Sequence, residues 1–110
     1  MVKILKAEGF DEKLASFVAG CQAISDRYME SSGYKGRVQI TGDQIPGSRY
    51  VRVVRAEPGS RSVHCFVDKT NGDVLMAAGW KAPAKNPRGN IFQADNGLTR
   101  MGPYGAAYNK

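Results

Sequence analysis

Aromatic and basic side chains alternate with apolar ones in the middle of the chain, in a pattern that could bind a flat, negatively charged ligand. Tyr50 and Arg52 lie two positions apart in one run, and His64 and Phe66 lie two apart in another. Aromatic rings stack on nucleic-acid bases for about 1–3 kcal/mol each, and arginine pairs with phosphate or stacks through its planar guanidinium. These residue types therefore predict binding of a single-stranded nucleic acid.

A second segment with the same chemistry is Trp80-Lys81-Ala82-Pro83-Ala84-Lys85-Asn86-Pro87-Arg88-Gly89-Asn90. Its prolines limit the freedom of the backbone, and its cations could follow a phosphate backbone. For Lys81, Lys85 and Arg88, phosphate contact and plain solvation both stay open. Trp80 is either a stacking platform or the buried anchor of the segment that follows it.

Strands must position these side chains, because three runs alternate with a period of two: residues 37–41, 50–55 and 62–67. Residues 73–78 predict a fourth strand, joined to the third by a tight turn at Asn71-Gly72. Alternation sorts the side chains onto two faces. The expected core face carries Val38, Ile40, Val51, Val53, Val63, Cys65 and Val67. The other face carries Arg37, Gln39, Thr41, Tyr50, Arg52, Val54, His64 and Phe66.

An amphipathic helix precedes the strands and is expected to cover the core face. Its apolar positions recur at helical spacing: Leu14, Phe17, Val18, Cys21, Ile24 and Tyr28. Asp11 is the expected N-cap, and Ser31-Ser32-Gly33 supplies the end of the helix. This helix is not basic, whereas reading a duplex groove favours a basic helix or ribbon. The sequence therefore favours single strands over duplex.

The chain has 110 residues, which fits one domain. We expect an α+β fold in which one N-terminal helix packs on a four-stranded antiparallel sheet. The expected segments are a lead (residues 1–10), the helix (11–33), the sheet (35–80) and an irregular, basic C-terminal arm (81–110). The arm contains three prolines and no clear periodicity, and long irregular segments often carry function.

The charge distribution also favours a polyanionic partner. The formal net charge is +6; residues 1–34 carry four basic and five acidic side chains, whereas residues 35–110 carry twelve and five. No apolar run is long enough to span a bilayer, and residues 1–9 are too short and polar for a signal peptide. We expect a cytoplasmic protein without a membrane partner. Cys21 and Cys65 are expected to be buried free thiols.

The sequence gives little support for catalysis. His64 and Cys65 are neighbours on an expected strand, so they point to opposite faces and cannot form a nucleophile and base pair. No phosphate-binding glycine loop, nucleophile elbow or paired set of metal ligands is present. We therefore expect a binding protein rather than an enzyme, with no cofactor and no metal.

Two stretches resemble a group of small phage-encoded proteins, some of which look like single-stranded DNA-binding proteins of phage replication. The stretches are Arg61-Ser62-Val63-His64-Cys65-Phe66-Val67-Asp68 with Thr70-Asn71-Gly72-Asp73-Val74-Leu75, and Trp80-Lys81-Ala82-Pro83-Ala84-Lys85 with Arg88-Gly89-Asn90-Ile91. The resemblance implies a phage protein that handles single-stranded DNA in the host cytoplasm during replication or recombination. The expected fold is also similar to PUR and Whirly-type binders, which implies a homodimer or a larger homo-oligomer.

Other interpretations stay open at this point. Tyr50 and Phe66 could be buried under the C-terminal arm or a dimer partner, because aromatic pairs across strands also stabilise ordinary sheets. The same side chains could anchor a host or viral protein partner. A structural or packaging role is a third alternative. No feature distinguishes DNA from RNA as the single strand.

Overall fold

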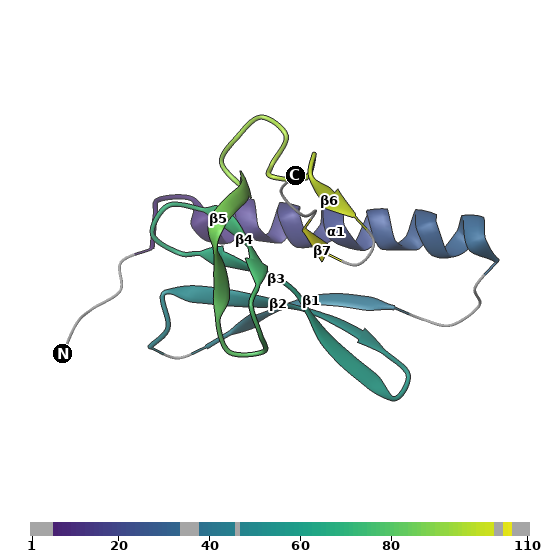
Figure 1. Cartoon of the computed structure of the whole chain (residues 1–110). Helices are drawn as coiled ribbons and strands as arrows, with labels where there is room; N and C mark the ends of the chain where they lie inside the picture. The colour runs from purple at the N-terminus through teal and green to yellow at the C-terminus, as the bar shows by residue number, and fades with distance from the viewer. Residues whose placement is uncertain (1–5, 34–37, 46, 103–104, 107–110) are drawn as a thin grey trace.

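In a computed structural model, one helix packs on a curved antiparallel sheet (Figure 1). The structure describes residues 6–33, 38–45, 47–102 and 105–106. The elements are α1 (Phe10–Ser32), β1 (Gln39–Gln44), β2 (Tyr50–Glu57), β3 (Ser60–Asp68), β4 (Asp73–Ala77), β5 (Pro83–Asn90), β6 (Met101–Gly102) and β7 (Gly105–Ala106). The sheet is five-stranded in the order β1-β2-β3-β4-β5, and β6 and β7 form a separate two-stranded ladder. The predicted α+β fold is confirmed, with five strands in place of four.

Helix α1 follows the predicted amphipathic pattern but begins differently. Its N-cap is Gly9, in the left-handed conformation, and no side chain caps it. Asp11 is therefore not the N-cap; it lies in the first turn, where a carboxylate complements the helix dipole, and it pairs with Lys6 at 3.1 Å. The predicted end is confirmed, because Gly33 adopts φ 77° and donates its N–H to Glu30 O at 3.3 Å.

The core lies between α1 and one face of the sheet. Six of the seven residues predicted for the core face are in it: Val38, Ile40, Val51, Val53, Cys65 and Val67. Cys21 of α1 lies in the same cluster, and both cysteines are free thiols as predicted. Burial raises the pKa of the Cys21 thiol to about 12, and burial next to Cys21 raises that of Cys65 as well. Both thiols therefore stay protonated and poorly nucleophilic at neutral pH.

Val63 is the exception because the ladder between β2 and β3 contains an irregularity. Val53 lies opposite Cys65, but Val54 lies opposite Val63, so His64 is an extra residue on β3. Such a bulge breaks strict alternation and increases the local twist. Val63 thereby shares the register position of Val54, on the face away from α1, and is only half-buried.

The predicted hairpin between β3 and β4 is confirmed. Gly72 adopts φ 82°, a conformation that glycine tolerates best, and its N–H donates to Asp68 O at 2.8 Å. The side-chain oxygen of Asn71 accepts the N–H of Asp73 at 2.9 Å. This side-chain bond is typical of asparagine in turns.

The prediction of an irregular arm over residues 81–110 is wrong for its first part, because residues 83–90 form β5. This strand was hidden in the sequence by its prolines, by Asn86 at φ 46°, and by extra residues that shift its register against β4. Prolines are tolerated here because β5 is an edge strand of the sheet.

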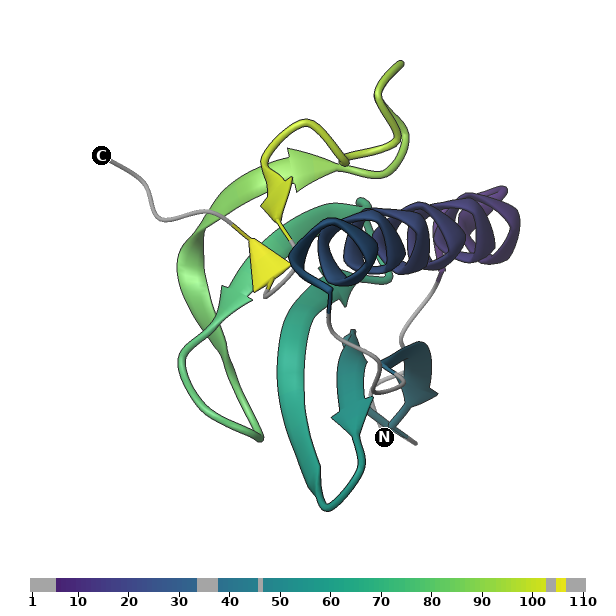
Figure 2. The ribbon, with the colours of Figure 1, turned by 90° about the vertical axis from the view of Figure 1, so that its right-hand side faces the viewer.

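The chain then returns to the helix side of the sheet. Ile91 and Met101 complete the core, and Asn96 donates its side-chain N–H to Lys13 O at 3.1 Å. Figure 2 shows β6 and β7 beside α1, on the same side of the sheet. Within the described part of the chain, no helix combines the length and apolar character needed to cross a membrane.

Candidate nucleic-acid interface

An exposed tryptophan lies at the turn between β4 and β5, next to two arginines. Trp80 is 40% exposed. The guanidinium carbon of Arg52 lies 4.5 Å from the centre of its ring, and that of Arg61 lies 5.5 Å away. We call Trp80, Arg52 and Arg61 the Trp80 cluster. Cations within about 6 Å of an indole ring are attracted by its electron-rich face.

The two arginines reach the ring from separate places on one face of the sheet. Arg61 lies opposite Ala56 in the ladder, and Ala56 is four residues beyond Arg52 on β2. Four residues of strand span about 13 Å. Both side chains belong to the face away from α1, because Arg52 and Ala56 alternate with the core residue Val53. Trp80 therefore lies over this face, with both guanidiniums near its ring.

Arg52 is held firmly and fixes the turn that carries Trp80. Its Nη1 donates to the Asp43 carboxylate at 2.9 Å, and its Nε donates to the backbone oxygen of Trp80 at 2.9 Å. Its side chain is only 12% exposed. Arg52 was predicted to contact phosphate, but these contacts favour a role in which it positions Trp80 and covers part of the ring.

Three other cations are solvent-exposed: Arg61 beside the ring, Lys81 next to Trp80 in the chain, and Lys85 on β5. Among the residues that the structure describes, no carboxylate pairs with any of them. Lys81 and Lys85 were predicted from the sequence. Arg61 was not; the two-residue turn Pro58-Gly59 could have revealed it, because that turn sets Arg61 opposite Ala56.

Phe66 was predicted to be an exposed stacking residue, and that exposure is wrong: the side chain is 1% exposed. Phe66 lies between Arg52 and Leu75 in a row across three strands. The bond from Arg52 to Trp80 ties the β4–β5 turn to β2, on either side of the strand that carries Phe66. Phe66 is thus buried, as the alternative interpretation expected; its cover by the C-terminal arm or a dimer partner stays a prediction.

Tyr50 remains half-buried beside Phe66. The two rings meet edge to face, with centres 6.3 Å apart. Arg49, a second residue that sequence reasoning missed, lies 5.9 Å from the Tyr50 ring and pairs with Asp68 at 2.8 Å. Burial opposes ionisation of Asp68, but hydrogen bonds from Arg49 and Thr70 outweigh it and lower the pKa of this carboxyl. Tyr50 thus lies at the margin of the surface, next to a neutralised cation.

His64 was also expected on the exposed face, and it is buried at 3% exposure. Burial, followed by the positive charge of Arg55, lowers the pKa of His64 to about 4. The ring is therefore neutral at pH 7. Neither ring nitrogen has a hydrogen-bond partner among the described residues. His64 cannot contact phosphate from this position.

Arg88 and Arg37 complete the predicted set. Arg88 is 9% exposed and donates from Nη1 to the backbone oxygen of Asn86 at 2.8 Å, so the prediction of an accessible cation is wrong. It is the extra residue between Gly89 and Pro87 in the ladder with β4. Such a bulge re-aims a side chain. Arg37 lies outside the described residues.

The Trp80 cluster contains no thiol, imidazole or carboxylate side chain. No group of three or more metal-binding side chains occurs among the residues that the structure describes. The two thiols are buried in the core, and the neutral His64 is buried as well. Trp80, by contrast, is exposed and has two arginines beside its ring.

Neither a curated protein nor a solved structure matches the chain. One family model matches residues 10–103, and this range includes the helix, the five-stranded sheet and every member of the Trp80 cluster. The chain therefore belongs to the family of unknown function DUF7717.

Proposed function

We propose that this protein binds single-stranded DNA without strong sequence preference, and that the Trp80 cluster is the contact site. The observation that carries the proposal is the exposed ring of Trp80 at a hairpin turn, with Arg61 exposed beside the ring and Lys81 and Lys85 exposed in the segment that follows it. An exposed aromatic platform with adjacent unpaired cations is the usual chemistry of single-strand binding.

Single strands fit this surface better than duplex. In duplex DNA the flat faces of the bases are stacked on each other, so a side chain at a hairpin turn has no base face to contact. Unpaired bases leave their faces open, and each has a π-face that an indole can stack on. The helix that could enter a major groove lies elsewhere, because α1 packs on the opposite face of the sheet.

Arg52 and Arg61 have different parts in the proposed binding. Arg52 stays in place because it is bonded to both Asp43 and the backbone of Trp80. Arg61 is exposed and makes no such bonds to the residues that the structure describes, so a base can take its place over the indole ring. The displaced guanidinium then pairs with a phosphate, where arginine forms strong, charge-assisted hydrogen bonds.

Salt dependence follows from the number of free cations. Phosphate contacts by Arg61, Lys81 and Lys85 release counterions from the strand. Three contacts predict a slope of about −2 for log K against log salt concentration. In keeping with the resemblance of the two sequence stretches, we place this activity in phage genome replication or recombination.

The test is fluorescence anisotropy of a labelled single strand of about 30 nucleotides and of the matched duplex, each at low and moderate salt. The Trp80→Ala variant should weaken binding of the single strand about 5- to 150-fold, which corresponds to the 1–3 kcal/mol of one stacking contact. Phe92→Ala is the matched control, because Phe92 is also an exposed aromatic, at 36%, but lies outside the cluster.

Charge variants test the phosphate contacts separately. Lys81→Ala should reduce the salt slope by about 0.7. Lys13→Ala, which removes an exposed cation from α1, should leave the slope unchanged. Equal binding by the wild type and Trp80→Ala would refute the site. Binding to neither nucleic acid would refute the function and favour a protein partner anchored on Trp80.

A further inference from the structure

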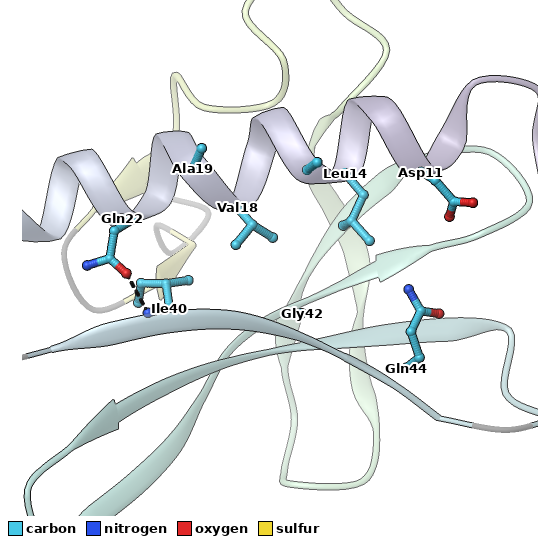
Figure 3. Close-up of a pocket in the computed structure, with 9 residues that line it drawn as sticks. Asp11, Leu14, Val18, Ala19, Gln22, Ile40, Gly42 and Gln44 are labelled. Atoms are coloured by element: carbon cyan, nitrogen blue, oxygen red, sulfur yellow. Dashed lines mark hydrogen bonds between the residues drawn. The ribbon is translucent and has the colours of Figure 1, made fainter.

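A groove of about 620 Å³ lies between α1 and the free edge of the sheet (Figure 3). Its walls are mostly apolar: Leu14, Ala15, Val18 and Ala19 from the helix, and Ile40 and Gly42 from β1. The strand on its floor, β1, is the first strand of the sheet and pairs with β2 on one side only. The groove thus exposes a strand edge beside an apolar helix surface.

Gln22 already occupies part of this edge. Its side-chain amide donates to Val38 O at 2.9 Å and accepts the N–H of Ile40 at 2.7 Å, as a neighbouring strand would. In an antiparallel strand the N–H and C=O of one residue point to the same side, and this direction alternates along the strand. Since the backbone N–H of Ile40 points to the free edge, the backbone N–H and C=O groups of Gly42 and Gln44 point to it too. Among the described residues, the backbone groups of Gly42 and Gln44 have no partner on this side.

The open stretch is short and closed at both ends. The Gln22 amide occupies it as far as the N–H of Ile40, and beyond Gln44 the chain turns, with the N–H of Ser48 donating to Ile45 O at 3.0 Å. A long foreign strand would collide with one of these ends. A second copy meets this limit, because its own chain turns after Gln44, the residue that would lie opposite Ile40.

We propose that a second copy of this chain pairs its β1 with this edge, antiparallel, about a two-fold axis at Gly42. Gly42 of each copy then exchanges two backbone hydrogen bonds with the other. The N–H of Gln44 donates to the C=O of Ile40 in the other copy, and the reverse, which gives four bonds. An interface of this kind uses the same patch on both subunits.

The charges along β1 are compatible with self-association. Monomeric proteins commonly protect an edge strand with charges or proline, because like charges repel across a two-fold axis. From Gln39 to Gln44, β1 carries one charged side chain, Asp43, and Arg52 neutralises it at 2.9 Å. Asp11, which also lines the groove, pairs with Lys6 at 3.1 Å, so each of these two carboxylates has a cation beside it.

The two helices would meet in this arrangement. A two-fold axis perpendicular to the sheet places both helices on the same face of the joined sheet, side by side. Ala15 and Ala19 line the groove and are exposed. Alanines at a contact let helix axes approach to about 8 Å, the lower end of the usual range. The two Trp80 clusters would lie together on the opposite face. The inference goes beyond the proposed function and does not depend on it.

Disulfide trapping tests the register. In the proposed dimer the two copies of residue 42 face each other with Cα atoms about 5.5 Å apart, within the disulfide range. A Cβ at Gly42 would come no closer than 3.7 Å to Val51, so the Gly42→Cys variant should fold. Gln39→Cys is the control on the same strand, because its two copies would be about 20 Å apart. Glutathione disulfide is the oxidant; two protein thiols lose two hydrogens and reduce it to two glutathione thiols.

We expect Gly42→Cys to form a covalent dimer at least about tenfold faster than Gln39→Cys. Cys21 and Cys65 should not react, since both are buried. Light scattering of the wild type should give twice the chain mass of 11.9 kDa. The amide protons of Gly42 and Gln44 should exchange more slowly as the protein concentration rises.

Three outcomes would overturn the inference: equal linking of the two variants, a monomer mass at about 100 μM, or amide exchange that is independent of concentration. A monomer whose Gly42 amide exchanges slowly only after another protein is added would also overturn the inference, because the groove would then bind that protein. The wild-type measurements stand even if a cysteine variant does not fold. None of these assays contains DNA, so a negative result here refutes the dimer without bearing on the DNA titration of Trp80→Ala.

Discussion

Replacing His64 with leucine should remove a large part of the acid sensitivity of the fold. His64 is 3% exposed, and its pKa falls from an ordinary value of 6.5 to about 4. Leucine places an apolar side chain of similar size at the same position. The substitution therefore removes a titrating group without opening a large cavity in the sheet.

The magnitude follows from the pKa difference. Above pH 6.5 the ring is neutral in both the folded and the unfolded chain. The contribution of His64 to the free energy of unfolding therefore does not change with pH in that range. Between pH 6.5 and about 4, His64 is protonated in the unfolded chain but stays neutral in the folded chain, so the free energy of unfolding falls. A difference of about 2.5 pH units corresponds to about 3 kcal/mol at 1.36 kcal/mol per unit.

The assay is urea unfolding of the wild type and His64→Leu at several pH values from 7.5 to 4.5, followed by circular dichroism. Carboxylates such as Asp68 have a lowered pKa in both proteins, so their effect cancels in the difference. We expect the advantage of His64→Leu over the wild type to grow by about 2–3 kcal/mol as the pH falls across this range. Parallel pH profiles for the two proteins would refute the argument, because they would mean that folded His64 takes up its proton as readily as the unfolded chain does.

Two further changes test the hairpin between β3 and β4. Gly72→Ala should lower the urea midpoint more than Gly33→Ala: both glycines have positive φ, which costs about 1–2 kcal/mol, but only at Gly72 would the new Cβ meet a side chain, Phe92, at 2.5 Å. Equal losses would show that Phe92 simply moves aside. Asp68→Asn should cost about 1–3 kcal/mol at pH 7, because the buried carboxylate accepts bonds from both Arg49 and Thr70. Since the pKa of Asp68 is lowered, this difference should vanish as the pH falls through its folded value; a difference that persists in urea titrations at strongly acidic pH would contradict it.

Much of the fold could be predicted because the local patterns agree with the final packing. The apolar spacing of α1 and the Asn71-Gly72 turn each have one strong structural meaning, and both are present as predicted. β5 could not be predicted in this way. Asn86 at positive φ and the extra residue at Arg88 destroy the alternation by which a strand is recognised.

The sequence indicated the residue types of the candidate site, but not which of those residues are exposed. Trp80, Lys81 and Lys85 lie at the surface where the sequence placed cations and an aromatic ring. Phe66 and His64 are buried instead, for two physical reasons. The bulge at His64 changes which face a side chain reaches, and the bond from Arg52 to Trp80 closes the hairpin over the sheet. Such a closure joins residues 28 positions apart, and a period-two pattern carries no information about it.

The late segment that returns to the helix also constrains how the protein is made. Ile91 and Met101 belong to the same core as Phe10, and Asn96 bonds to the backbone of Lys13, 83 residues earlier. During synthesis at about 5–20 residues per second, the apolar face of the helix therefore waits on the order of 5–20 seconds for its last partners. Contacts so distant along the chain also slow folding, because a long loop must close before they form. A ribosome that stops before Met101 would release a chain with an incomplete core and an exposed apolar helix, the kind of product that chaperones retain and proteases remove.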